Sequence, residues 1–579
     1  MLKKIITGSF ALCSSFLMAL DEQAAAKRIY AHLFIHDPVS AVAEAKKSLA
    51  LFPESKQLHF ALIRALCESG EEVDALDHWQ KTLSIFEGEH KNRNLLEVLA
   101  WGVLNNGKSS NQLSIRMNAL LGASFTQDAK AIPLLLMHLR SSNAWMRTMA
   151  VRLAASYGDA PLQDEIERLL KTEKVWYVRL EAIKAAGQLR MIKMRPFLKG
   201  LIGNTKTLAE EKTEAIIALV NMYESIDREE LKSMVLSPRA GLRELASEII
   251  SHLDLREHAG TLISLLQDTS ADVRMSALNA LGLMRIQKYK GQTLVEMIKN
   301  SLNDPAPEVS ITAGWLMTLC NEATGLDNLE KWMSDSNPNF RRLAAAALSV
   351  TGKNGTALAD KILKQSSDPY VRINLALGLI GQRVHVDSAC NALYAILSSK
   401  KEELWMWDNS GNPLFRSLSP SRVRHIDQVP NYPVVIDQMV HLELLSVLSV
   451  MRHAQAQSAL RNFLKNQTWG VISAAASTLL QEGDEESLEI VRGLLADPDE
   501  KVRFQAALIL ALIGSDPAAI KVLQEVYPHM ERETKVYILE AIAHIGDPES
   551  IPFLIEILKE PFQVLRVVAA SALIQCLYH

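Results

Sequence analysis

The most specific chemical pattern in the chain is a glycine-rich run that ends in Lys-Ser. Gly102–Ser109 (GVLNNGKS) satisfies the phosphate-loop pattern, in which glycines let backbone N–H groups surround phosphate while Lys and Ser reach phosphate and magnesium. That chemistry requires a buried strand before the run. Residues 95–104 instead place apolar side chains at helical spacing, which favours a helix ending in an Asn-Asn-Gly turn. Nucleotide binding is therefore an alternative and not the main prediction.

Other catalytic patterns are weaker. His441 and Glu443 form an isolated pair, and no HExxH or GxSxG motif occurs. Five cysteines without a CxxC pair argue against a disulfide scaffold and against a zinc-finger array. We predict no catalytic residue, no cofactor and no metal ligand, and hence a protein that is not an enzyme.

Composition indicates a large helical protein. Of 579 residues, 48% are hydrophobic, 22% are charged and only 6% are aromatic, which is globular usage and suits an all-α chain better than a β-sandwich. Lys and Arg number 62 against 66 Asp and Glu, for a net charge of -4. This balance argues against nucleic acid as the partner.

The first residues have the features of an export signal. Lys3 and Lys4 precede an uncharged apolar stretch from Ile5 to Leu20, which is shorter than the roughly 20 residues of a membrane span. We expect residues 1–20 to be a signal peptide, a mature chain that begins near Leu20 or Asp21, and a periplasmic or envelope-associated protein. An uncleaved N-terminus, and with it a cytoplasmic adaptor, is the alternative.

Two kinds of internal repeat fill the rest of the chain. Ala41 and Leu49 are matched 34 residues later by Ala75 and Leu83, and small residues at fixed helical positions let paired helices approach closely. This step resembles tetratricopeptide repeats (TPR) over about residues 22–90. We assign residues 21–95 to TPR-like helices.

From about residue 112 the period shortens to 31–33 residues. Each unit reads Asp/Asn-Pro, then a Val-Arg-like pair, then Ala and Leu at helical spacing, as in Asp497-Pro498 and Val502-Arg503. Lys212, Ser310, Ile472 and Lys535 stand where Arg is missing. The Arg slot, as we call this position, is filled by Arg116, Arg147, Arg179, Arg243, Arg274, Arg341, Arg372, Arg503 and Arg566.

This pattern resembles HEAT repeats, particularly the subtype of the bilin (PBS) lyases. The resemblance implies an α-solenoid, a superhelix of stacked helix pairs, across residues 96–404 and 438–579. It carries over no active-site residue, so a lyase-like enzyme stays an alternative only. We expect the Arg slots to bridge to Asp and carbonyl groups and so align successive repeats. A basic ladder for an acidic ligand is the other interpretation.

Helix ends follow from the same repeats. Asp caps a helix and Pro suits its first turn, so each Asp-Pro predicts a helix start, and Gly514 is expected as a left-handed cap. In a simple solenoid Cys67, Cys320, Cys390 and Cys576 are too far apart to pair. The last helix, residues 565–579, has no capping helix after it. We therefore expect a partner or self-association through the C-terminal repeat to cover it.

One segment, residues 405–437, interrupts the repeats. Four prolines prevent a continuous helix, and loops of this length are commonly functional. Trp and Arg dominate binding hot spots, and stiff backbone lowers the entropy lost on binding. A purely structural role, filling a gap between mismatched repeats, is the alternative. The candidate partner-binding residues are Trp405, Trp407, Phe415, Arg416, Arg422 and Arg424.

The sequence thus predicts an exported, non-enzymatic helical-repeat scaffold that mediates protein–protein interactions in the cell envelope. The partner is a protein of unknown identity, with no nucleic acid and no membrane span after signal cleavage.

Overall fold

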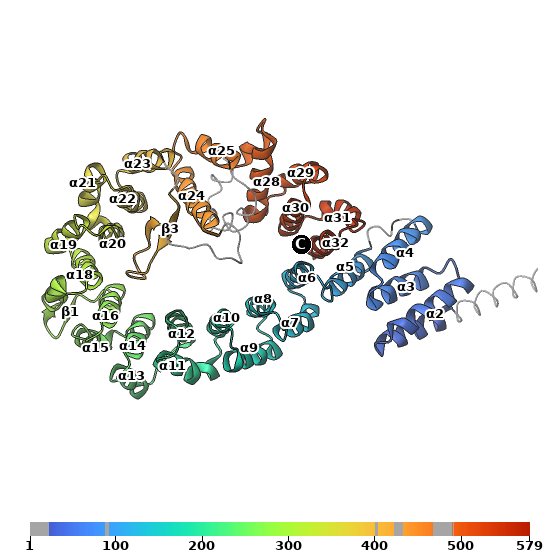
Figure 1. The fold of residues 1–579 in the computed structure, drawn as a ribbon, viewed down its shortest axis with the longest axis horizontal. Helices are drawn as coiled ribbons and strands as arrows, with labels where there is room; N and C mark the ends of the chain where they lie inside the picture. The colour runs from blue at the N-terminus through green and yellow to red at the C-terminus, as the bar shows by residue number, and fades with distance from the viewer. Residues whose placement is uncertain are drawn as a thin grey trace, which may run out of the picture. The chain divides into compact units, whose positions relative to one another are not determined.

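The computed structural model describes residues 22–86, 88, 92–399, 403–421, 432–466, 489 and 491–578. The predicted signal peptide, Arg422, Arg424 and Ile472 lie outside these residues. The chain divides into two compact units: unit 1 comprises Met1–Leu162 with Ala506–His579, and unit 2 comprises Gln163–Gln505. Nearly every described element is a helix, so the all-α prediction is confirmed (Figure 1).

Unit 1 begins with a helix over residues 22–34 and contains helices from both ends of the chain. Its elements are α2 (Pro38–Leu51), α3 (Lys56–Ser69), α4 (Glu72–Ile85), α5 (Arg93–Gly107), α6 (Leu113–Phe125), α7 (Ile132–Leu139), α8 (Ala144–Ala154), α29 (Ala518–Val526), α30 (Arg532–Ile545), α31 (Ile551–Ile557) and α32 (Gln563–Tyr578). Helices α9 (Ala160–Thr172) and α28 (Glu500–Gly514) cross the unit boundaries.

Unit 2 is a succession of helix pairs. The first helices of the pairs are α11 (Arg195–Gly203), α13 (Arg228–Val235), α15 (Ala259–Leu265), α17 (Leu294–Ile298), α19 (Ala323–Met333), α21 (Thr356–Gln365) and α23 (Val386–Ser398). The second helices are α10 (Trp176–Gln188), α12 (Ala209–Met222), α14 (Ala240–His252), α16 (Ala271–Leu283), α18 (Pro307–Leu319), α20 (Pro338–Ser349), α22 (Pro369–Gly381) and α24 (Tyr432–Val450), followed by α25 (Ala456–Asn466). Figure 1 shows the even-numbered helices from α10 to α22, which we call the inner helices, on the inner side of the curve of this unit.

Two short hairpins interrupt the helices of unit 2. Strands β1 (Lys288–Tyr289) and β2 (Gln292–Thr293) pair antiparallel between α16 and α17. Because of this hairpin, 36 residues separate the Arg slots at 274 and 310, more than the 31–33 that the repeat predicts. Strands β3 (Trp405–Asp408) and β4 (Ser417–Pro420) form the second hairpin, inside the predicted insertion.

The helix starts follow the sequence. The Asp368 carboxylate accepts hydrogen bonds from the backbone N–H groups of Tyr370 and Val371, and Pro369 stands at the first position of α22. One predicted helix end is wrong: Gly514 is the last residue of α28, and the left-handed residue is Ser515, with φ of 45°.

Small residues let the helices of the predicted TPR-like segment approach one another. Ala41 of α2 and Ala75 of α4 are fully buried, while Leu49 and Leu83, at the other matched positions, are half-buried. Equivalent positions of the two 34-residue repeats therefore have the same degree of burial. Helix α3 packs against α2, α4 and α5.

The last helix of the chain packs against α5 and α6 within unit 1. Two glycines make this approach close. A Cβ on Gly107 would lie 2.8 Å from Cγ2 of Val567, and one on Gly122 would lie 2.8 Å from Cβ of Ser571. The Ser571 hydroxyl donates to the Gly122 carbonyl at 3.1 Å.

Polar contacts add to this packing. The Arg566 guanidinium donates from Nε to the Glu72 carboxylate at 2.9 Å, and the Tyr578 hydroxyl bonds Glu97. The Arg93 guanidinium lies 4.0 Å from the centre of the Tyr578 ring. The expectation that a partner or a second copy covers α32 is therefore wrong, because earlier helices of the same chain already cover it.

Among the described residues, no helix combines the length and the apolar character needed to cross a bilayer. In the same part of the chain, no three His, Cys, Asp or Glu side chains gather as metal ligands do. Cys67, Cys320, Cys390 and Cys576 are free thiols, and all but Cys320 are buried.

Candidate interaction site on the inner helices of unit 2

The Arg slots connect successive repeats. Arg274 donates from Nη1 to the Asp268 carbonyl at 2.8 Å, and from Nε and Nη2 to the two carboxylate oxygens of Asp304 at 2.7 Å each. The Asp268 carboxylate in turn accepts from Arg243 at 2.6 and 2.7 Å. Each aspartate thus receives one Arg from the repeat before it, and the hydrogen bond from Arg243 lowers the pKa of Asp268.

The other slots repeat part of this geometry. Arg116, Arg147 and Arg503 donate to the carbonyl six residues earlier, as Arg274 does. Carboxylates of another repeat accept from three more slots, in the pairs Arg179–Glu211, Arg341–Asp368 and Arg566–Glu72. The Nε of Arg372 is buried and makes no hydrogen bond among the described residues. These contacts are the ones that alignment of successive repeats requires. That the Arg slots align the repeats stays a prediction.

The predicted insertion is a hairpin and not a strand-free loop. Trp405 pairs with Pro420 and Trp407 with Leu418, so β3 and β4 run antiparallel over four residues each. Strand β4 packs against α20 and α22, and β3 packs against α24. Helix α24 begins at Tyr432, before the predicted end of the insertion.

Asn412, at the tip of the hairpin, is fully buried in a polar network. Its Nδ2 donates to Oδ1 of Asn279 on α16 at 3.0 Å and to Oγ1 of Thr312 on α18 at 2.8 Å. Asn279 donates back from Nδ2 to Oδ1 of Asn412 at 3.2 Å. One side chain of the hairpin therefore joins two inner helices that are at least a hundred residues away in sequence.

The backbone of β4 is held in the same manner. Oδ1 of Asn374, on α22, accepts the Leu418 N–H at 2.9 Å, and its Nδ2 lies 3.5 Å from the Leu418 carbonyl. The Asn374 amide thus contacts both the N–H and the carbonyl of one extended residue, Leu418. Sequence reasoning missed Asn279, Thr312 and Asn374, although an Asn on the apolar face of a helix is itself a signal that a polar partner covers it.

The structure places the six candidate residues of the insertion in three environments. Trp405 and Phe415 are 4% and 0% exposed, and Phe415 packs edge-on against Trp315 with ring centres 5.4 Å apart. Trp407 donates from Nε1 to Glu443, which also pairs with Arg416 at 2.7 Å. Arg422 and Arg424 lie outside the described residues. Trp405 and Phe415 therefore hold the hairpin to the inner helices and are not available to a partner.

The phosphate-loop pattern does not form a phosphate loop. Residues 102–107 belong to α5, so their backbone N–H groups serve the helix. A Cβ on Gly102 would lie 2.7 Å from Cβ of Cys67, so this glycine serves helix packing. Lys108 donates from Nζ to the neighbouring Asn105. The nucleotide-binding alternative through Gly102–Ser109 is therefore wrong.

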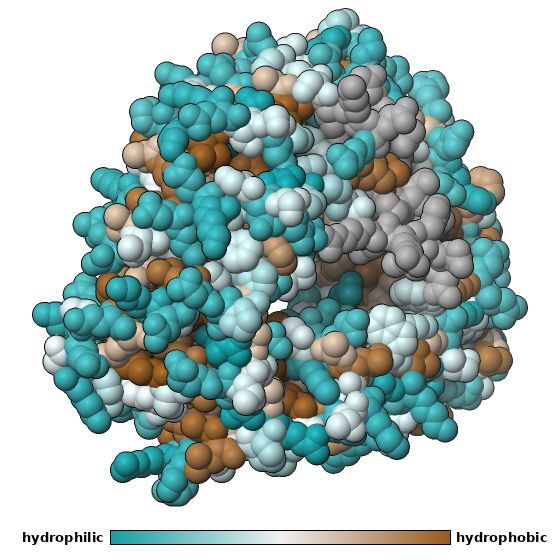
Figure 2. Space-filling model, turned by 60° about the vertical axis from the view of Figure 1, so that its left-hand side comes forward, coloured by the Kyte–Doolittle hydropathy of each residue, from teal (hydrophilic) through white to brown (hydrophobic). Residues whose placement is uncertain are grey.

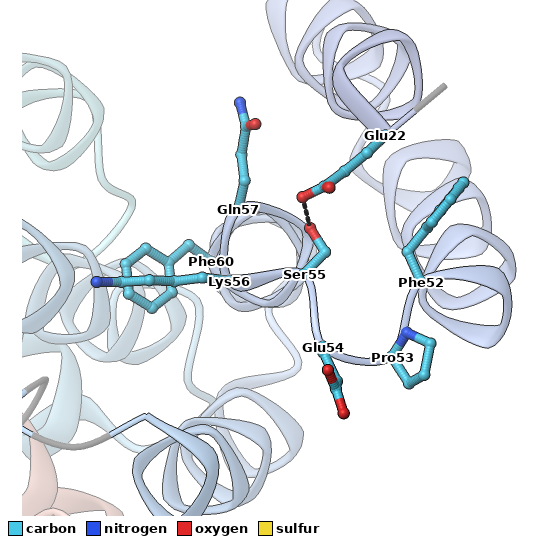
Figure 3. A pocket seen from close by; sticks show the side chains of 8 residues that line it. All are labelled: Glu22, Phe52, Pro53, Glu54, Ser55, Lys56, Gln57 and Phe60. Atoms are coloured by element: carbon cyan, nitrogen blue, oxygen red, sulfur yellow. Dashed lines mark hydrogen bonds between the residues drawn. The ribbon is translucent and has the colours of Figure 1, made fainter. Parts of the chain in front are cut away.

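A separate cavity of about 810 Å³ lies in unit 1 at the start of α3 (Figure 3). Glu22, Phe52, Ser55 and Phe60 are among the residues that line it. The Ser55 hydroxyl bonds Glu22 and accepts the Leu58 N–H, so it serves as the cap of α3. Two of the polar side chains in its lining, Ser55 and Glu22, are thus used by the fold.

The comparisons with known proteins agree with the repeat pattern. Residues 490–574 match the HEAT repeats family. No curated protein matches the chain. HEAT repeats pack as helix pairs, so this match and the structure together make the chain a helical-repeat solenoid.

Solved structures of low similarity were also found. The chain is similar to the myosin chaperone UNC-45 from C. elegans in complex with a Hsp90 peptide, at 13% identity and a TM-score of 0.33, over 97% of this chain and 82% of that chain. It is similar to a protein in the Kap95:Nup1 complex at 10% identity and a TM-score of 0.36, over 90% and 81% of the two chains. At these scores neither likeness carries an argument about function.

Proposed function

We propose that this protein is an exported, non-enzymatic helical-repeat scaffold that binds protein partners in the cell envelope. The observation that carries the proposal is the docking of the hairpin of residues 405–420 on the inner helices. It is a polypeptide segment bound by the solenoid surface, in cis.

The contacts that hold this hairpin are those of polypeptide recognition. Asn374 matches the N–H and carbonyl of one extended residue, which every amino acid except proline offers. Phe415 and Leu418 occupy buried apolar positions, both at 0% exposure. Backbone contacts with alternate apolar side chains are how extended peptides bind to many protein surfaces. The inner helices α10, α12 and α14, which do not pack against β3 or β4 in the described part of the chain, offer a surface for a partner.

Export rests on the sequence of the first residues, where Lys3 and Lys4 precede the apolar stretch. Fractionation of the source cells and the intact mass of the native protein test this part. We expect an envelope fraction and a mass that corresponds to a start near Leu20 or Asp21. A cytoplasmic chain that starts at Met1 contradicts export and leaves the adaptor alternative.

Partner binding is tested by cross-linking of the native protein before purification, followed by mass spectrometry. We expect partner cross-links on α10, α12 and α14, with fewer on α11 and α13, the matched control helices. A protein that elutes alone, or cross-links confined to the control helices, refutes the proposal. Thermal-shift screens with nucleotides and tetrapyrroles should give no stabilisation, and a clear shift favours an enzyme instead.

A further inference from the structure

Nine residues after the Arg slots at 179, 212, 243, 274, 310 and 341, at the end of the inner helix, stands a side chain that the fold leaves exposed. In α10, α12 and α14 this side chain is polar: Gln188, Asn221 and His252. In the next three repeats it is apolar and still exposed: Leu283, Leu319 and Val350 are 54%, 36% and 46% exposed. Figure 2 shows one face of the molecule on which hydrophobic residues stand in small groups among hydrophilic ones.

Polar residues at three equivalent positions show that the repeat does not require an apolar side chain there. Three exposed apolar residues in consecutive repeats, which we call the apolar stripe, therefore do not serve the packing of the helix pairs. The neighbours lie together, since α18 contacts both α16 and α20. Asn354, which follows Val350 closely, donates to the Thr318 carbonyl at 3.0 Å, next to Leu319.

A cavity of about 770 Å³ opens between the first two members of the stripe. Leu283 and Leu319 line it together with Val295, and Gly282 and Trp315 line it as well. A Cβ on Gly282 would lie 2.4 Å from the Trp315 ring, so the glycine makes room for the indole beside the cavity. The cavity can thus accept a large apolar side chain, which the flat exposed leucines alone cannot.

Cations predominate around the stripe. Arg285 lines the cavity, Lys288 follows it on β1, and Lys353 follows Val350. All three are exposed, and none makes an ion pair with a described residue. Glu322 is the one carboxylate that lines the cavity in the described part of the chain. The surroundings therefore favour an acidic partner over a basic one.

The spacing of the stripe selects the form of the partner. Packed helices lie about 8–10 Å apart, so the members of the stripe recur at about that distance. Residues i and i+7 of an α-helix lie about 10.5 Å apart on one face. In an extended strand, residues on one face recur at about 7 Å or 14 Å, which fits less well.

We propose that the apolar stripe is the docking site for an amphipathic α-helix of a protein partner, with apolar residues at i, i+7 and i+14 and acidic residues beside them. The middle or first apolar side chain enters the cavity between Leu283 and Leu319, and Arg285 pairs with an acidic neighbour. This proposal rests on the proposed scaffold function and names the partner class that one part of the solenoid recognises.

The probe is a fluorescein-labelled helical peptide of about 18 residues, with Leu at i, i+7 and i+14 and Glu at the flanking positions. A matched peptide carries Lys instead of Glu. Fluorescence anisotropy with the recombinant chain should show binding of the Glu peptide that weakens at high salt, and much weaker binding of the Lys peptide. Leu283→Gln with Leu319→Gln should weaken the Glu peptide at least about tenfold.

Leu236→Gln is the matched control, because Leu236 is 71% exposed and lies outside the stripe. Leu236→Gln should leave the affinity for the Glu peptide unchanged. All variants should retain the melting temperature, since Gln188 already occupies the equivalent position in α10. Val350→Asn is a second, independent variant, chosen because Asn221 occupies the equivalent position in α12. It should weaken binding less, because Val350 lies away from the cavity.

Alkylation of Cys320 shows whether the Glu peptide binds at the cavity. Its half-buried thiol lines the cavity, whereas the thiols of Cys67, Cys390 and Cys576 are buried. Bound Glu peptide should slow alkylation of Cys320 by N-ethylmaleimide, followed by mass spectrometry. Absence of binding, equal binding by the Leu283/Leu319 variant, or unprotected Cys320 overturns the proposal. Partner cross-links on α10, α12 and α14 that persist in that variant show that the scaffold function stands without the stripe.

Discussion

Removal of Arg274 tests whether the Arg slots align the repeats. Its guanidinium and the Asp304 carboxylate are nearly buried, with side chains 13% and 9% exposed. In Arg274→Ala, Asp304 keeps the Ala306 N–H at 2.9 Å but loses both charge-assisted hydrogen bonds, and the Asp268 carbonyl loses a donor. Breaking such a buried pair costs about 3–5 kcal/mol, and we expect about 3 because one donor to Asp304 remains.

Arg190→Ala is the matched control. Arg190 and Glu224 pair at the same 2.7 Å, but their side chains are 61% and 75% exposed. Exposed pairs contribute about 0–1 kcal/mol, so this variant should be nearly as stable as the parent. The two pairs have the same contact distance, but the Arg274 pair is buried and makes two hydrogen bonds to its carboxylate, whereas the Arg190 pair is exposed and makes one.

The assay is urea unfolding followed by circular dichroism, with hydrogen exchange on α16 and α18 to locate the loss, because repeat proteins open in parts. Asp304→Ala and the double variant complete a cycle, which should give a coupling of about 1.5–3 kcal/mol. A loss in Arg274→Ala no larger than in the control refutes the alignment role. Retained stability with lost binding of an acidic ligand would favour the ladder interpretation.

Three further outcomes are expected. Burial, with the charges of Asp272 and Glu248, raises the pKa of Glu244 to about 7, so the folded state favours the protonated acid. The protonated Glu244 therefore stabilises the folded state fully below about pH 4.5, and this stabilisation is lost as the pH rises toward 7. Glu244→Gln should therefore stabilise the protein by about 2 kcal/mol at pH 8 and by little at pH 4.5, measured by urea unfolding; equal effects at both pH values contradict the shift. Gly107→Ala places a Cβ 2.8 Å from Val567 and should cost about 1–2 kcal/mol, which Val567→Ala should partly restore; a neutral Gly107→Ala argues against the packing of α32 on α5. Lys108→Ala should leave thermal shifts with ATP and magnesium unchanged, because residues 102–107 are helical, and an ATP shift lost in this variant would contradict that conclusion.

The sequence by itself determined the repeat architecture, because the signals are local. Asp368 and Pro369 fix a helix start within three residues, and Arg274 reaches a carbonyl six residues before it. Periodic Ala and Leu positions predict which face of each helix is buried. The same locality explains why residues 95–104 could be assigned to a helix although a phosphate-loop pattern begins at Gly102.

Only the tertiary structure decided what covers the ends and the inner face. Arg566 and Glu72 lie 494 residues apart in sequence, and Asn412 and Asn279 lie 133 apart. Arg566 occupies a periodic slot, but neither Glu72 nor Asn412 has a periodic signal in the sequence, so the sequence does not show which residue each of them meets. A polar residue such as Asn279 shows in the sequence that a partner is needed, but its partner is chosen by the accumulated curvature of the helix pairs between them.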